Sequence, residues 1–162
     1  MIIDLRSYPL EPMVYIMDKY LLPFKTPFVK FSSGNTDYPG YFEYEKIVKN
    51  GKSNKDYYKG KVIILINEIT QSQAEFTAMA LRTAPKAIVI GSTTAGADGN
   101  TSVIRLPGGI LTIISGIGVF YPDGKQTQRI GIIPNIELKP SIKGITEGRD
   151  ELVEKAIEVI NQ

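Results

Sequence analysis

A serine occupies the point where a buried strand is expected to give way to a helix. Ser72 follows the apolar run KVIILIN and precedes a segment with apolar residues at helical spacing. The start of a helix offers unpaired N–H groups and a positive partial charge, which would stabilise an oxyanion formed beside it. Ser72 is therefore a candidate nucleophile. The alternative is a helix cap, because Ser72 and Glu75 have the S-x-x-E spacing of a capping box, and the local pattern by itself favours that interpretation.

Two missing residue types limit the chemistry. The 162 residues include no cysteine and no histidine. This excludes disulfides and thiol nucleophiles, and it removes the commonest general base and the commonest metal ligand. We expect no cofactor and no metal. A base that activates Ser72 must be another residue type or lie outside this sequence.

Charge and hydropathy exclude two classes of partner. The 19 basic and 17 acidic residues give a net charge of +2 with no basic block, so no nucleic-acid footprint is present. No apolar run approaches the roughly 20 residues of a membrane-spanning helix. The opening MIIDLRSYPL lacks the basic and apolar regions of a signal peptide. The compartment and the oligomeric state stay undetermined, and export of a longer parent protein remains open.

The spacing of apolar residues predicts an α/β domain around a parallel sheet. Residues 61–67 and 87–91 read as adjacent parallel strands joined by a helix over 73–83, a strand–helix–strand unit. Further strands are expected at 1–6, 26–31, 102–106, 110–115, 118–121 and 136–138. Helices are expected at 10–22, with Met13, Val14, Ile16, Met17, Tyr20 and Leu21 inward, and at 149–160, with Leu152, Ala156, Ile157 and Ile160 inward. Residues 32–60 read as an irregular, turn-rich insertion.

Six motifs in order carry a family resemblance. They are IIDLRSYP, VIILINEITQSQAEFTAMAL, AIVIGSTTAGADGN, LPGG, YPDGKQTQRIGIIPNI and GRDELVEKAIEVI. The series resembles the catalytic core of the carboxyl-terminal processing, or tail-specific, peptidases, a family that includes the tricorn core and a chlamydial secreted protease. The match covers nearly the whole chain and is weakest over 32–60. It implies a crotonase/ClpP-like spiral of strand–strand–helix units around a mainly parallel sheet, serine peptidase chemistry and a polypeptide substrate.

The resemblance assigns roles at the serine. It implies that Ser72 is the nucleophile and that the Gln73 N–H donates to the oxyanion. A second donor would come from the loop after the D-L-R strand. Many members have a glycine pair there, whereas this chain has Ser7, Tyr8, Pro9 and Leu10. The resemblance also implies substrate contacts for Tyr8, Gly96 and Ala97.

The general base departs from the lysine-dependent members. Their lysine lies 25 residues after the serine, where this chain has Ala97. If the correspondence holds, the Cα atoms of Ser72 and Ala97 lie within about 12 Å, the reach of a long side chain plus a hydrogen bond. The neighbouring Asp98 is expected to be an exposed turn residue, with Gly99 and Asn100, and its ordinary pKa would make it a weak base.

The T-A-G-A loop is closer to the tricorn and chlamydial type. In those members a histidine from an earlier part of the polypeptide is the base and a carboxylate orients it. Here Gln128 stands at the orienting position and Asn135 replaces the usual aspartate. A glutamine could hold a histidine tautomer by a hydrogen bond, but without a charge. Gln128 as an ordinary surface residue is an equal alternative.

These observations favour one hypothesis and leave two others. The first is that residues 1–162 are the C-terminal catalytic core of a longer serine peptidase, with a histidine base upstream and little activity in the core alone. The second is a catalytically inactive homologue that binds peptides. The third is an acyl-CoA-handling crotonase homologue, which the sequence disfavours because the paired oxyanion glycines are not found.

Overall fold

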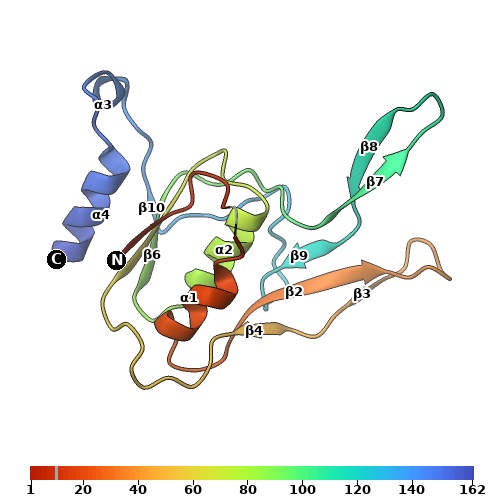
Figure 1. Cartoon of the computed structure of the whole chain (residues 1–162), viewed down its shortest axis with the longest axis horizontal. Helices are drawn as coiled ribbons and strands as arrows, with labels where there is room; N and C mark the ends of the chain where they lie inside the picture. The colour runs from red at the N-terminus through yellow and green to blue at the C-terminus, as the bar shows by residue number, and fades with distance from the viewer. Residues whose placement is uncertain (10) are drawn as a thin grey trace.

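A four-stranded parallel sheet forms the centre of the molecule. The computed structural model of the chain describes residues 1–9 and 11–162 (Figure 1). The sheet has the order β1-β5-β6-β10. Its strands are β1 (Ile2–Asp4), β5 (Val62–Ile66), β6 (Ala87–Gly91) and β10 (Ile136–Glu137). The pairing of β5 with β6 runs from Val62 opposite Ala87 to Ile66 opposite Gly91 and is parallel, which confirms the predicted strand pair.

Helices cover both faces of this sheet. α1 (Val14–Leu21) and α2 (Gln73–Leu81) share one buried cluster with Ile64 and Ile66. α4 (Glu151–Asn161) contributes Leu152, Ala156 and Val159 to a second cluster with Ile63 and Leu65. Successive side chains of a strand point to opposite faces, so the continuous apolar run of β5 supplies both clusters. A short helix, α3 (Ile142–Thr146), precedes α4.

A second sheet is formed by three short strands that pair with one long strand. β2 (Thr26–Gly34) pairs antiparallel with β3 (Phe42–Tyr44), β4 (Val48–Asn50) and β9 (Gly118–Phe120). The segment 32–60 is therefore less irregular than its composition predicts, since it completes β2 and contributes β3 and β4. The sequence missed β4, which is only three residues long and ends on the buried Asn50, whose amide donates to the Ala80 carbonyl at 3.1 Å.

A hairpin of β7 (Thr101–Arg105) and β8 (Leu111–Ser115) extends away from the parallel sheet on the same side as the β2–β3 ribbon (Figure 1). All residues of both strands are exposed. Its turn contains Gly108 and Gly109 at φ 84° and 78°, a region that favours glycine. The two glycines belong to the sequence Pro107-Gly108-Gly109.

The predicted helix faces need two corrections. In α1 the buried residues are Val14, Asp18 and Leu21, while Ile16 and Tyr20 are exposed. In α4 Val159 is buried and Ile157 is half exposed. The α1 helix also begins at Val14, and the predicted start at Leu10 lies outside the described residues. Both short helices offer more apolar residues than one face can hold, so the partner surface selects among them.

Within residues 1–9 and 11–162, no helix has the length and apolar character needed to cross a membrane.

Candidate active site

Ser72 lies on a strained turn between β5 and α2. Its backbone has φ 52° and ψ −118°, and only one other non-glycine residue of the described chain, Arg129, has a positive φ. Such a conformation costs on the order of 1–3 kcal/mol and persists where the surroundings fix it. The half-buried serine precedes the first turn of α2. The sequence correctly predicts this strand-to-helix junction.

Glu75 holds the strained backbone at Ser72 in place. Its fully buried carboxyl group accepts hydrogen bonds from the N–H of Ser72 at 3.1 Å, of Gly96 at 2.8 Å and of Ala97 at 2.9 Å, and from the Thr94 hydroxyl. Ser72 and Glu75 form the capping box that their spacing predicts, in which the Ser72 N–H donates to the Glu75 carboxylate.

The loop after β6 passes directly beside the serine. The Ser72 N–H also donates to the Ala97 carbonyl oxygen at 3.1 Å. Residues joined by a backbone hydrogen bond have Cα atoms well within the predicted limit. This confirms that Ala97 lies within reach of Ser72. The exposed side chain at this place is a methyl group, which carries no proton acceptor.

Hydrogen bonds tie together the carboxyl ends of three parallel strands. The buried Thr70 hydroxyl donates to the Leu5 carbonyl at 3.0 Å, and the Thr70 carbonyl accepts from the Ala95 N–H at 3.0 Å. The loops after β1, β5 and β6 are thus held against one another. Ligand sites of open α/β sheets typically lie at this edge.

The Gln73 N–H is a free donor at the first position of α2. It makes no hydrogen bond to any residue within 1–9 or 11–162. An unpaired N–H beside the serine has the position that an oxyanion donor requires. For the second donor the sequence indicates the loop of Ser7 to Leu10, of which Leu10 lies outside the described residues. The Tyr8 side chain is 57% exposed and does not line the pocket at Ser72.

A pocket of about 320 Å³ opens at Ser72. Phe76 of α2 lines it, whereas Met79 of the same helix is buried in the core, and Phe42 and Tyr44 line a separate pocket. Gly96 and Ala97 contact Glu75 through their N–H groups and are not among the lining residues. The lining residues are Tyr15, Phe31, Glu45, Val48, Ser72, Gln73, Phe76, Asp98, Gly99, Asn100 and Ile117.

Asp98 differs from its expected state. The sequence predicts an exposed turn residue with an ordinary pKa, but Asp98 is only 8% exposed. Burial, together with the nearby Glu75 carboxylate and against a hydrogen bond from the Gly99 N–H, raises its pKa to about 7. The Oδ1 atom accepts that Gly99 hydrogen bond at 2.7 Å, and Oδ2 is buried without a partner in the described part of the chain. The predicted turn is present, but the packing around it determines the burial and the pKa of the Asp98 carboxyl group.

The Gln128 side-chain amide is hydrogen-bonded to backbone groups. Its amide nitrogen donates to the carbonyls of Asp98 and Ile117, both at 2.8 Å, and its amide oxygen accepts from the Val119 N–H at 3.3 Å. These bonds anchor the Asp98 loop against β9. The Asn135 side chain likewise accepts from the Val89 N–H at 2.9 Å and holds the edge of β6.

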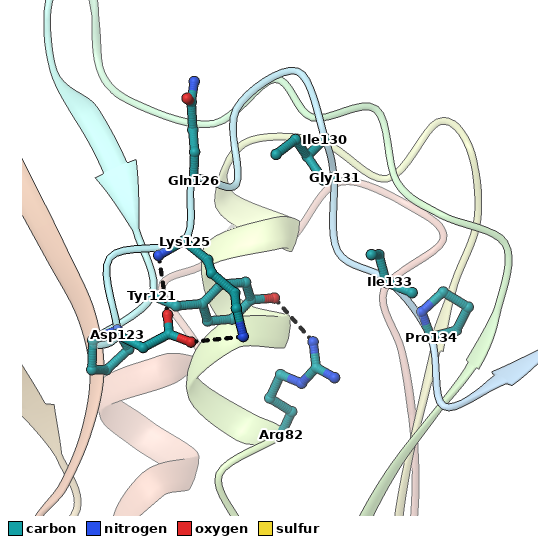
Figure 2. A pocket seen from close by; sticks show the side chains of 10 residues that line it. Arg82, Tyr121, Asp123, Lys125, Gln126, Ile130, Gly131, Ile133 and Pro134 are labelled. Atoms are coloured by element: carbon teal, nitrogen blue, oxygen red, sulfur yellow. Dashed lines mark hydrogen bonds and ion pairs between the residues drawn. The ribbon is translucent and has the colours of Figure 1, made fainter.

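A larger cavity of about 690 Å³ lies elsewhere and shares none of these lining residues (Figure 2). Figure 2 shows Arg82 directed at the Tyr121 hydroxyl, with Lys125 and Asp123 paired beside it. The remaining walls include Ile130, Ile133 and Pro134. Burial raises the pKa of Tyr121. This cavity contains no candidate nucleophile of the kind found at Ser72.

The fold and the site define an α/β protein with a serine on a strained strand-to-helix turn, at the carboxyl edge of a parallel sheet. The model of peptidase family S41 matches residues 1–138. The chain belongs to this family.

Solved structures agree in fold. A protein of Parabacteroides merdae assigned as a peptidase superposes with a TM-score of 0.81 at 22% identity, over 91% of this chain and 46% of that one. The photosystem II D1 C-terminal processing protease gives 0.62 at 20%, over 93% and 39%. Mature CPAF gives 0.74 at 17%, over 99% and 44%. The chain thus spans less than half the length of these relatives. No curated protein sequence is significantly similar to it.

Proposed function

We propose that this chain is the catalytic core of a serine endopeptidase of the carboxyl-terminal processing type, with Ser72 as its nucleophile. The observation that carries the proposal is the strained Ser72 turn, where the serine lies next to the free N–H of Gln73 and lines a pocket. A non-glycine residue held at positive φ at a helix start is a costly arrangement. Exposure of a nucleophile beside oxyanion donors explains that cost.

The reaction follows from these groups. The Ser72 Oγ attacks the carbonyl carbon of the scissile peptide bond while a base takes the hydroxyl proton. The Gln73 N–H donates to the oxyanion of the tetrahedral intermediate. The proton then passes to the leaving amine, and water hydrolyses the acyl-enzyme by the same steps in reverse order.

The base is the part that these 162 residues lack. The chain has no histidine, and its family lysine position is Ala97. We assign the base to a histidine in an earlier part of a longer polypeptide. The short coverage of the solved relatives, 46% and 44% of two of them, is consistent with such a parent protein. Gln128 is not assigned the orienting role, because its amide is committed to backbone groups.

The test compares the full-length protein, its Ser72→Ala variant and residues 1–162 alone on an unfolded protein substrate. We expect cleavage only by the unmodified full-length protein, because an unactivated serine hydroxyl is a poor nucleophile. Residual acceleration of roughly 10³ to 10⁴ over water by binding and oxyanion stabilisation would stay invisible against slow peptide hydrolysis. Ser53→Ala, at an exposed serine outside the pocket, is the matched control.

Two results would contradict the proposal. Unchanged cleavage by Ser72→Ala would remove Ser72 from the mechanism, and robust cleavage by residues 1–162 would place the base inside this chain. The second candidate, an inactive peptide-binding homologue, is favoured by the absence of histidine and of a lysine at position 97. It predicts that the full-length protein binds peptides without cleaving them.

A further inference from the structure

Asp98, in the wall of the Ser72 pocket, has a carboxyl oxygen that is closed to solvent and unpaired in the described part of the chain. The residue is more than nine-tenths buried, its Oδ1 accepts from the Gly99 N–H, and its Oδ2 has no partner among residues 1–9 and 11–162. A buried polar atom without a hydrogen bond is destabilising, and more so when it is charged. Asp98 lines the same pocket as Ser72 and Gln73. A ligand group reaches this oxygen only if the pocket wall moves slightly, and it would then supply the missing partner.

The missing partner is not the Ser72 hydroxyl. Oδ2 accepts no hydrogen bond from any described residue, so the Ser72 hydroxyl does not donate to it in this structure. A general base must lie within about 2.6–3.2 Å of the proton that it abstracts, or act through one water. The geometry therefore favours substrate recognition over proton abstraction from Ser72.

The pocket has the composition of a site for a long cationic side chain. Its charged lining residues are Glu45 and Asp98, and it contains no lysine or arginine. The other walls are mainly apolar, from Phe31, Phe76 and Ile117. Lysine and arginine side chains place an apolar stem along such walls and a charged head at a carboxylate.

We propose that Asp98 is a specificity-determining residue that recognises the ammonium or guanidinium group of a substrate lysine or arginine, held in the Ser72 pocket beside the scissile bond. This inference rests on the proposed function for its catalytic meaning, although the recognition itself requires no cleavage. The favoured substrates are polypeptides with a basic residue next to the cut.

The titration of Asp98 supports this role. Its pKa of about 7 reflects burial without a counter-charge, and a bound cation would lower that pKa. The other titratable groups that face it are Glu75, which accepts four hydrogen bonds behind it, and Glu45 and Tyr15 on the pocket wall. A peptide lysine stays charged up to pH ~10. Preference for a cationic side chain should therefore increase as the pH rises through 7.

The test measures peptide binding to the full-length protein carrying Ser72→Ala, which keeps the peptides intact. Two peptides differ only in having lysine or norleucine at one position, so that they share a stem and differ in the charged head. We expect the lysine peptide to bind about tenfold tighter or better at pH 8, since a hydrogen bond to a charged group contributes roughly 1.5–3 kcal/mol. At pH 5.5 the ratio should fall severalfold. Adding Asp98→Asn should bring it close to one, whereas Asp56→Asn, at an exposed position outside the pocket, should leave it unchanged.

Several results would overturn this inference. They are equal binding of the two peptides, a ratio that is constant from pH 5.5 to 8, and a lysine preference that survives Asp98→Asn in a variant that still unfolds in one cooperative transition. If Asp98→Asn does not fold, the inference is tested by the Ser72→Ala protein alone. The measurement is then the pH dependence of its affinity ratio for the lysine and norleucine peptides. Because binding is measured without cleavage, loss of the lysine preference overturns only this inference. Unchanged cleavage by Ser72→Ala overturns only the proposed function.

Discussion

The Ser72 N–H and the Ala97 carbonyl oxygen are joined by a hydrogen bond of 3.1 Å. This bond brings the residue at the lysine position of the lysine-dependent members next to the candidate nucleophile. The side chain at this position, next to Ser72, is only a methyl group.

The first prediction is that Ala97→Lys supplies a base. A lysine amine next to the Ser72 hydroxyl could accept its proton, and a positioned base contributes typically 10²–10⁴-fold. We expect residues 1–162 with Ala97→Lys to react with an organophosphonate serine probe about a hundredfold faster than the unmodified chain, with the rate rising with pH. Intact-mass analysis should locate the adduct on Ser72. Ala97→Met, of similar length without a base, is the control, and equal labelling of the two variants would show that position 97 cannot reach the hydroxyl.

A second prediction concerns the strain at Ser72. Because φ is 52° and ψ is −118°, a residue without a Cβ should fit this backbone better than serine or alanine. We expect Ser72→Gly to exceed Ser72→Ala in free energy of unfolding by about 1 kcal/mol, measured by urea denaturation. If the alanine variant is equally stable, the turn stores no strain, and the positive φ loses its weight as an indication of function.

Third, Glu75 should matter more for stability than any exposed glutamate. Glu75→Ala leaves the N–H groups of Gly96 and Ala97 and the Thr94 hydroxyl without their acceptor at a buried position. We expect a loss of about 3 kcal/mol or more in free energy of unfolding, whereas the exposed Glu158→Ala should change it by about 0.5 kcal/mol or less. Urea denaturation of both variants checks this. Similar losses would mean that the loop after β6 is held by other contacts.

The fourth prediction follows from the pKa of Asp98. A carboxyl group with a pKa of about 7 in the folded state and 3.8 when unfolded binds more protons when folded between these values. Stability therefore falls as the pH rises from about 4 to 7, by an amount on the order of 4 kcal/mol for a pKa of about 7 instead of 3.8. Asp98→Asn removes this titration.

We expect the stability of Asp98→Asn relative to the unmodified protein to increase by about 2–4 kcal/mol between pH 4 and pH 8. Urea denaturation across this range measures it, with Asp56→Asn as an exposed control whose difference should stay flat. A flat difference for Asp98→Asn would show that its carboxyl group titrates normally.

The sequence by itself determined the central parallel sheet and the place of the serine. The run of β5 is apolar at every position, so it must be covered on both faces, and the segments around it leave only a strand–helix–strand arrangement. The junction that follows fixes Ser72 at the start of α2. These features depend on neighbours along the chain, which the order of residues records directly.

Tertiary structure alone decided the state of the side chains around the serine. Asp98 lies in a turn sequence typical of exposed loops, but Gln128, 30 residues later, holds that turn against β9 and buries it. The same packing occupies the Gln128 amide with backbone groups. In α1 and α4 the partner surfaces selected Asp18 and Val159 for burial over Ile16 and Ile157. Burial and the pKa values that follow from it depend on contacts between segments distant in sequence, which local patterns do not contain.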